Sequence, residues 1–328
     1  MTLLKRLILT GSAFLMISGL LAQSVSNAVT DSIFKKQGEV YFSFPLNKKQ
    51  SIRQLTRIIS IDKISKKTVY AYASEREFSE LKRLVSDITI LPSPGTSTPE
   101  SDLNMGGVTQ PEGEKTQWNF YPTYDQYIDF MVGFVNSYPT LCKLDTVGTS
   151  IQGRMILALK ISDNPSLEEA EPQVLYTSSI HGDETTGYIL MLHLIDHLLL
   201  SYGTDPELTE LVNTTEIFIN PLANPDGTYW GGNNSVYGAR RYNANSIDIN
   251  RNFPDPKVGP HPDGNAWQQE TEAWMDYATR NHFSVSANFH GGAEVFNYPW
   301  DTWSKLPADA QWWEFVGRMY VDSVHLVS

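Results

Sequence analysis

The pattern of apolar and polar positions divides the chain into two parts that predict different structures. In residues 30–91, the strand-like runs "GEVYFSF", "KTVYAYAS" and "ITIL" alternate with two runs of helical spacing, "SIRQLTRII" and "REFSELKRLV". Short strands and helices in this order can form a small sandwich of the two. Residues 30–91 are therefore predicted to be a small α+β N-terminal domain.

Residues 92–117 differ from the segments on both sides. They are rich in Pro, Gly, Ser, Thr and Glu and contain few bulky apolar side chains. Such a composition is typical of a linker, because it offers little surface that a core could bury.

Residues 118–328 have longer elements. The runs "YDQYIDFMVGFVNSYP" and "TTGYILMLHLIDHLLLSYG" have helical spacing, and the second is predicted to end at Gly203. The strand-like runs are "LCKLDTVG", "MILALKIS", "QVLYTSSI", "TEIFIN" and "FSVSANFH". "QVLYTSSI" is almost continuously apolar, as expected for a strand buried on both faces. Strands that alternate with helices predict an α/β fold with a mixed, largely parallel twisted sheet flanked by helices.

The first residues have the pattern of a secretory signal. Lys5 and Arg6 form a short positive region, residues 7–21 form an apolar core, and Ala22 is a small residue suited to cleavage. The alternative is a membrane anchor, but the apolar run is short for a bilayer, which needs about 20 residues. We therefore expect a signal peptide at residues 1–22 and a secreted or periplasmic protein with no integral membrane segment.

Composition narrows the possible partners. The net charge is −12 and no Lys/Arg-rich patch is present, which argues against nucleic acid as a partner. Cys142 is the single cysteine, so no intrachain disulfide is possible. Stability must come from the core or from a bound metal ion, and a monomer is the simplest expectation.

Two candidate metal ligands stand where an apolar strand gives way to a helix. In sheets of this kind, ligands bind at the carboxyl ends of the strands. His181 follows "QVLYTSSI", Glu184 lies at the start of the next helix, and His290 closes "FSVSANFH". Two imidazoles and one carboxylate leave a fourth position for water, which is the pattern of catalytic zinc. Each residue alone is a weak signal, because a histidine after a strand is more often a hydrogen-bonded packing residue.

A second pair of histidines has metal-ligand spacing but a different setting. His193 and His197, in "HLIDH", would share one helix face. The motif has no Glu after its first His and is surrounded by Leu and Ile, so we expect a structural role.

A polar cluster, "GARRYNANSIDINRNFPD", contains Arg241, Asp248, Asn250 and Arg251. Guanidinium and amide groups close together suit an anionic, planar group such as a carboxylate. The alternative is a surface loop with salt bridges, which we prefer for Arg240. The strand-end position of "NRN" favours a binding site.

These motifs resemble a known family. "HGDE", "NPLANPDG", "IDINRNFPD" and "ANFHGGAEVFNYPWD" are similar to the zinc metallocarboxypeptidases, and most similar to the carboxypeptidase D/E/N-like branch. The resemblance covers roughly residues 118–328. It implies a metallocarboxypeptidase-like fold, peptide or protein C-termini as partners, and one Zn²⁺ ion as cofactor. The implied reaction is hydrolysis of the C-terminal residue, with zinc-bound water as the nucleophile.

The resemblance also implies roles for single residues. The zinc ligands would be His181, Glu184 and His290. Asp248 would hydrogen-bond to the first histidine and orient it.

The resemblance also implies that the substrate binds to the polar cluster. By the same resemblance, Arg241 would polarise the scissile carbonyl, and Asn250 and Arg251 would bind the terminal carboxylate. Asp301, in "NYPWD", would line the specificity pocket and select C-terminal Lys or Arg. The Trp in that motif departs from the family's Phe, and Asp301 as an ordinary loop residue is the alternative.

Part of the family's apparatus is not found. The family needs a glutamate general base and a tyrosine well beyond the third ligand. Glu294 is too close to His290, and Glu314 falls in a predicted helix, so neither is assigned. The sequence is therefore expected to be a C-terminally incomplete piece of an enzyme. The alternatives are a non-catalytic relative that binds zinc and peptide C-termini, and a murein peptide peptidase.

Residues 30–91 have a suitable size for the N-terminal module that covers the active site in the family's pro-forms. An unrelated accessory domain is the alternative, and the sequence favours neither.

Overall fold

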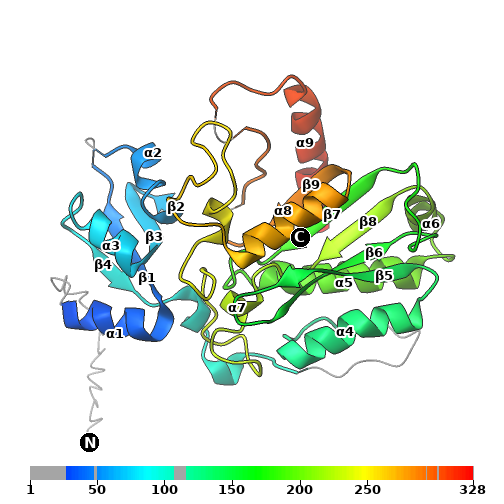
Figure 1. Cartoon of the computed structure of the whole chain (residues 1–328), viewed down its shortest axis with the longest axis horizontal. Coiled ribbons are helices and arrows are strands. Elements are labelled where there is room, and N and C mark those ends of the chain that lie inside the picture. Colours follow the sequence, from blue (N-terminus) through cyan, green and yellow to red (C-terminus); the bar gives the residue numbers. More distant parts are fainter. Residues whose placement is uncertain (1–26, 48–49, 107–115, 293, 301–302, 328) are drawn as a thin grey trace, which may run out of the picture.

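The computed structural model describes residues 27–47, 50–106, 116–292, 294–300 and 303–327. These residues form two units, each with its own sheet, which lie side by side in Figure 1. The predicted signal peptide at residues 1–22 lies outside the described residues. Within the described ranges, no helix combines the length and the apolar character needed to cross a membrane.

The N-terminal unit, residues 27–91, has an antiparallel sheet in the order β2-β3-β1-β4. Its buried side chains form a separate core that includes Phe42, Phe44 and Phe78. Its elements are α1 (Asn27–Gln37), β1 (Glu39–Pro45), α2 (Ile52–Leu55), β2 (Ser60–Ser65), β3 (Thr68–Ser74), α3 (Glu75–Leu81) and β4 (Thr89–Leu91).

The helix predicted over "SIRQLTRII" is shorter in the structure. Helix α2 ends at Leu55, and strand β2, which was not predicted, begins at Ser60 and pairs with Tyr72 of β3. Leu55 and Ile59 are both buried in the core of this unit, which a turn followed by an edge strand allows.

The larger unit contains most of the helical and strand residues. Its elements are α4 (Tyr124–Ser137), β5 (Cys142–Thr149), β6 (Met155–Ile161), β7 (Gln173–Ser178), α5 (Thr186–Ser201), α6 (Pro206–Asn213), β8 (Glu216–Asn220), α7 (Pro225–Thr228), η3 (Ile249–Arg251), α8 (Gln269–Arg280), β9 (Phe283–Phe289) and α9 (Ala310–Val327).

The sheet of the larger unit has the order β5-β6-β8-β7-β9. Strand β7 pairs in parallel with β8 and β9, whereas β5 with β6 and β6 with β8 are antiparallel. The predicted mixed α/β fold is confirmed, although parallel and antiparallel pairings are equally frequent among the described strands of this sheet. The hairpin between β5 and β6 accounts for the difference, because strands joined by a tight turn must run antiparallel.

Helices cover both faces of this sheet (Figure 1). Helices α4 and α5 pack on one face in a core that includes Tyr127, Tyr188 and Ile219. Helix α8 packs on the other face, where Trp274 and Tyr277 join Phe218. Strand β8 is buried at every position, as expected for a central strand between two helical layers.

The predicted linker, residues 92–117, is described at residues 92–106 and 116–117. It contains the short helices η1 (Pro94–Thr96) and η2 (Glu100–Asp102). This part lies against the larger unit, because the Gly238 N–H donates to the Gly95 carbonyl at 2.8 Å and Met105 forms a β-bridge with Tyr121.

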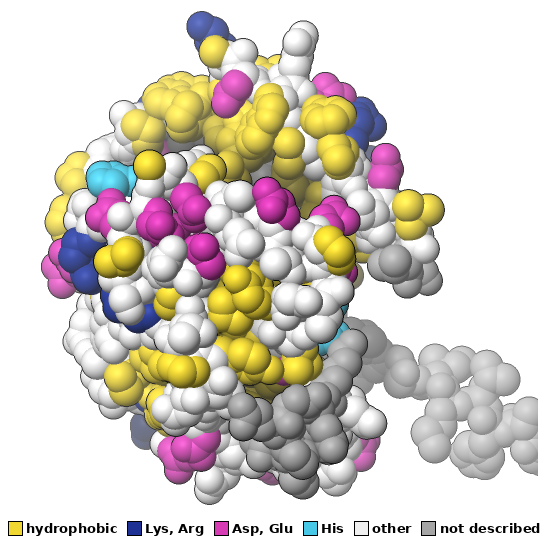
Figure 2. Space-filling view, turned by 90° about the vertical axis from the view of Figure 1, so that its right-hand side faces the viewer, with side chains coloured by type: hydrophobic (Ala, Val, Ile, Leu, Met, Phe, Trp, Pro, Cys, Tyr) yellow, Lys and Arg dark blue, Asp and Glu magenta, His cyan; other side chains and the backbone are white. Residues whose placement is uncertain are grey.

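Helix α9 presents an apolar surface to solvent. Apolar side chains gather at the upper part of the face in Figure 2, at the height of this helix. The exposed apolar side chains of α9 are Trp312, Phe315, Met319, Tyr320, Val324 and Leu326.

Candidate metal centre

The loop between β7 and α5 positions His181 and Glu184. Strand β7 ends at Ser178 and α5 begins at Thr186, so both side chains stand at the carboxyl edge of the sheet. A Cβ at Gly182 would lie 2.3 Å from the carbonyl carbon of Gly227. Glycine is therefore required at this position for the loop to pack against α7.

The third side chain comes from the neighbouring strand. Ser178 of β7 pairs with Phe289 of β9, and His290 follows directly. Parallel strands end at the same edge of a sheet, so this register places His290 beside the His181 loop. The structure brings together the three residues that were predicted as metal ligands.

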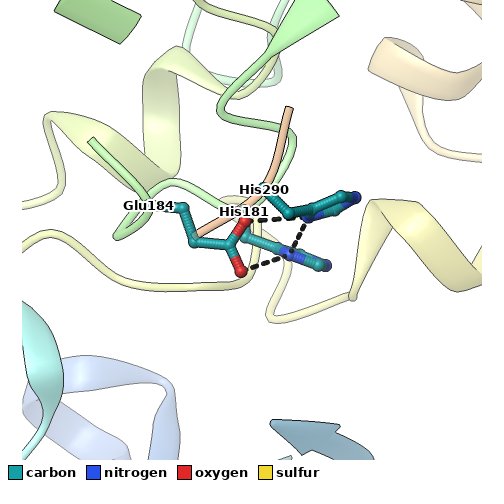
Figure 3. Close-up of side chains that lie close together, drawn as sticks. All are labelled: His181, Glu184 and His290. Carbon is teal, nitrogen blue, oxygen red and sulfur yellow. Dashed lines mark hydrogen bonds and ion pairs between the residues drawn. The ribbon is translucent and has the colours of Figure 1, made fainter. Parts of the chain in front are cut away.

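Figure 3 shows the three side chains pointing toward one another. The His181 Nδ1 lies 3.0 Å from Glu184 Oε1, and the His290 Nδ1 lies 2.8 Å from Glu184 Oε2. The two Nδ1 atoms are 3.1 Å apart. The His181 side chain is 3% exposed and that of His290 is 35% exposed, so the cluster is open to solvent on the His290 side.

The geometry and the donor set fit a zinc ion. Ligand atoms about 2.1 Å from a tetrahedral zinc lie about 3.4 Å from one another, somewhat more than the 2.8–3.1 Å separations in this cluster. Two neutral imidazoles and a carboxylate are the donors of catalytic zinc sites with an open position. His181, Glu184 and His290 are thus able to hold one Zn²⁺ ion.

Asp248 lies on the far side of His181. Its Oδ1 is 3.2 Å from His181 Nε2, and its own side chain is 4% exposed. With its Nε2–H donated to a carboxylate, the imidazole keeps Nδ1 free to ligate, and the ring is fixed in orientation.

Arg241 lies between the two acids of the site, of which Asp248 is buried and Glu184 is partly buried. Its NH1 is 3.3 Å from Glu184 Oε1, and its Nε is 3.3 Å from Asp248 Oδ2. Arg241 is 4% exposed, and its guanidinium carbon lies 5.2 Å from the centre of the Tyr72 ring. A fixed positive charge is thus held within contact distance of the candidate metal ligand Glu184.

Burial and charge compete over the pKa values of these groups. Burial raises the pKa of Glu184, but hydrogen bonds from His181 and His290 and the Arg241 charge prevail and hold it well below its ordinary value. Burial likewise opposes the ionised form of Asp248, yet His181 and Arg241 lower its pKa. Burial and Arg241 lower the pKa of His181, while Asp248 and Glu184 raise it, and the net shift is upward. Both acids are ionised at neutral pH.

Asn250 and Arg251 lie near the same carboxyl edge of the sheet. Both belong to the short helix η3, which Asp248 caps by accepting the Asn250 N–H at 2.9 Å. The Asn250 side-chain nitrogen lies 3.4 Å from His290 Nε2; Asn250 is half-buried, whereas His290 is exposed. Asp301 lies outside the described residues.

The other histidines and the late glutamates stay apart from the cluster. Among the described residues, His193 and His197 belong to no group of potential metal ligands. His197 Nδ1 instead lies 3.4 Å from Ser201 Oγ on the same helix. Glu294 is exposed, and Glu314 is exposed and bonded to Arg318 at 2.8 Å.

Sequence reasoning missed the side chains that the N-terminal unit sends to this site. Ser60 Oγ lies 2.5 Å from Asp248 Oδ2 and 2.7 Å from Arg241 Nε. The Tyr72 hydroxyl donates to Asp183 at 2.7 Å, and the Glu39 carboxylate accepts the Arg241 N–H at 2.9 Å. The sequence offered one signal for these contacts. In "HGDE", Asp183 stands next to the candidate ligand Glu184, and a second carboxylate at such a place needs a hydrogen-bond partner.

Comparison with known proteins identifies the family of this chain. Residues 127–328 match the family described as zinc carboxypeptidase. The chain belongs to this family.

Among curated relatives, carboxypeptidase D of Rattus norvegicus is 42% identical over 192 residues, which are 55% of this chain and 14% of that protein. Carboxypeptidase M of Mus musculus is 39% identical over 52% of this chain and 39% of its own length. The catalytic chain of human carboxypeptidase N is 35% identical over 54% of this chain and 44% of its own length. The chain thus spans less than half of each of these relatives.

Solved structures share the fold. A carboxypeptidase A from Helicoverpa armigera has a TM-score of 0.61 and 16% identity, covering 89% of this chain and 79% of that one. Thrombin activatable fibrinolysis inhibitor has a TM-score of 0.61 and 17% identity, covering 89% of this chain and 81% of that one. This coverage is greater than residues 118–328 alone provide, so the matched region includes part of the N-terminal unit.

Proposed function

We propose that the protein is a zinc-dependent metallocarboxypeptidase that removes the C-terminal residue of peptides or proteins. The observation that carries this proposal is the meeting of His181, Glu184 and His290 at the ends of two adjacent parallel strands. It is supported by the match of residues 127–328 to the zinc carboxypeptidase family.

Zinc bound there supplies Lewis acidity, which polarises a carbonyl and lowers the pKa of water towards about 7. The chain's own side chains set the conditions around it. Asp248 holds the tautomer and orientation of His181 through the 3.2 Å contact. Arg241 supplies a positive charge where an oxyanion develops, a contribution worth roughly 3 kcal/mol in comparable sites.

Asn250 and Arg251 are proposed to bind the substrate's free carboxylate. An amide and a guanidinium offer several donors to one planar anion. Their place in η3, with Asn250 3.4 Å from His290, supports this role. A site that requires a terminal carboxylate cleaves at the chain end and leaves internal bonds intact.

A direct experiment compares two forms of one peptide with the zinc-loaded protein. A peptide with a free C-terminus should release its last residue, whereas the same peptide with a C-terminal amide should not. The Arg251→Ala variant should raise KM for the free peptide. Equal cleavage of both forms would rule out an exopeptidase.

The preferred side chain is proposed to be Lys or Arg, on the basis of the resemblance to the carboxypeptidase D/E/N-like branch and of Asp301. Matched peptides ending in Arg and Phe test this. Faster release of Phe, or no change in the Asp301→Asn variant, would defeat it.

A second candidate is a zinc- and peptide-binding protein without turnover. It is favoured by the exposure of Glu294 and Glu314, the glutamates that follow the third ligand. Calorimetric titration with zinc and then with a peptide separates the candidates, because this one predicts binding of both without release of an amino acid.

Export is proposed from the N-terminal pattern described above. N-terminal sequencing of the protein recovered outside the cytoplasm should begin near Gln23. Recovery of a chain that starts at Met1 would argue against cleavage.

A further inference from the structure

The loop that carries Arg241 and Asp248 has no regular structure of its own. Residues 229–248, between α7 and η3, contain neither helix nor strand. Arg241 and Tyr242 are nevertheless almost completely buried. Buried main-chain N–H groups need acceptors, and a loop without helix or sheet must obtain them from elsewhere.

Glu39, the first residue of β1, supplies two of these acceptors. One carboxylate oxygen accepts the Arg241 N–H and the other accepts the Tyr242 N–H, each at 2.9 Å. Glu39 is 2% exposed. A single carboxylate from the N-terminal unit therefore fixes the main chain at the position from which the Arg241 side chain extends.

Ser60, the first residue of β2, fixes the side chain itself. Its hydroxyl accepts from Arg241 Nε at 2.7 Å and donates to Asp248 Oδ2 at 2.5 Å. A hydroxyl can accept and donate at once, so it satisfies a cation and an anion that lie on either side of it. The Tyr72 ring contacts the same guanidinium.

The junction around these contacts is packed like an interior. Arg240 is fully buried, its guanidinium carbon lies 3.5 Å from the centre of the Trp230 ring, and its NH1 donates to the Gln37 carbonyl at 2.8 Å. A Cβ at Gly38 would lie 2.2 Å from Arg240 NH1, at a φ of +71°. The interface between the two units thus has no space for a larger side chain at residue 38.

We propose that Glu39 and Ser60 are positioning residues for Arg241, so that the N-terminal unit is a working part of the site. Glu39 holds the main chain of the loop, and Ser60 holds the guanidinium against Asp248. The inference rests on the proposed function of Arg241. The contacts of Glu39 and Ser60 lie on the buried His181 side of the site, while the His290 side chain is 35% exposed.

The test uses the full chain and the variants Glu39→Ala, Glu39→Gln and Ser60→Ala. Glu80→Ala and Ser79→Ala, at exposed positions of the same unit, are matched controls. Hydrogen exchange of residues 237–248 reports loop order without turnover, and kcat and KM are measured on a peptide with a free C-terminus.

Glu39→Ala should speed exchange at Arg241 and Tyr242 at least about 10-fold, because both amides lose their acceptor. It should lower kcat about 10- to 100-fold with little change in KM, as a displaced oxyanion donor does. In Glu39→Gln, the changes in exchange and in kcat should both be smaller than in Glu39→Ala, since the amide oxygen of Gln still accepts one N–H. Ser60→Ala should lower kcat and leave exchange at residue 242 unchanged.

Exchange in Glu39→Ala equal to that in Glu80→Ala would overturn the proposal. A rise of kcat in Glu39→Ala or Ser60→Ala would also overturn it, in favour of an inhibitory pro-domain. If the wild-type protein shows no turnover, the proposed function fails, and the exchange measurement still decides whether Glu39 orders the loop.

Discussion

The two halves of the candidate site are held in different ways. His181, Glu184 and His290 stand at the ends of β7 and β9, where strand register brings them together. Arg241 and Asp248 stand on a loop without regular structure, where side chains from a different sheet hold them.

This difference shows that contacts between residues close in sequence build one half of the site, and contacts between residues far apart in sequence build the other. His181 and Glu184 are three residues apart and meet within one turn of chain. Arg241 is held by Ser60 and Glu39, which are 181 and 202 residues away. The first half should depend on the metal and the sheet, and the second on the junction between units.

Removing a ligand should produce the largest effect on the first half. We expect His181→Ala to lower zinc affinity by more than about 100-fold, the upper range for residues that only orient a ligand. Zinc content after dialysis measures it, with His197→Ala, exposed on α5, as the control. Full zinc occupancy in His181→Ala would remove the metal centre from this position.

The framework beneath the site should be the next most sensitive part. Asp226 is fully buried and accepts hydrogen bonds from Ser150, the Gln152 N–H and Arg154. Asp226→Ala leaves Arg154 without its partner and should cost about 3–5 kcal/mol of unfolding free energy. Urea unfolding tests it against Asp276→Ala, whose exposed pair with Arg280 should contribute less than about 1 kcal/mol.

The junction should show its own pH dependence. Burial, with the Asp183 charge adding to it and Arg240 opposing it, raises the pKa of Glu39 from 4.5 to about 7. Ionisation of Glu39 is therefore harder in the folded protein than in the unfolded chain, because the cost of burial outweighs the hydrogen bonds from the Arg241 and Tyr242 N–H groups. The associated stability is complete below about pH 4.5 and is lost as pH rises through 7, on the order of 3 kcal/mol in all.

The comparison that isolates this effect is wild type against Glu39→Gln, by urea unfolding from pH 4.5 to 8. The difference between the two should grow with pH, because glutamine does not ionise. A constant difference across the range would show that Glu39 titrates at its ordinary pKa.

Helix caps should give the smallest and most similar effects in the two units. Ser74 caps α3 and Thr123 caps α4, each in a capping box with the third helical residue. Replacing either by Ala should cost about 1 kcal/mol. A much larger loss for Ser74→Ala would mean that α3 also supports the junction, where Glu77 accepts from Tyr242 at 2.9 Å.

The ligand half of the site could be predicted from the sequence because its signals are local. An apolar strand followed by "HGDE", and another that ends in "FH", locate three side chains at one edge of a sheet. The supporting half could not be predicted in this way. Nothing near Glu39 or Ser60 distinguishes them from other strand residues, and their importance comes from packing between two sheets. Strand β2 was missed for a related reason, since Ile58 and Ile59 continue a helical pattern through a turn.

The contact of Gly38 with Arg240 has a practical consequence for protein engineering. The backbone passes from the N-terminal unit to the larger unit between the end of β4 at Leu91 and Gly95, and grafting a foreign N-terminal unit would naturally use that crossing. The packing of side chains places the boundary elsewhere, because residues 37–39 and 230–242 are packed against each other and must be exchanged together. A chimera that transplants both segments together should fold, whereas one recombined at the crossing alone would bring a mismatched surface against the arginine.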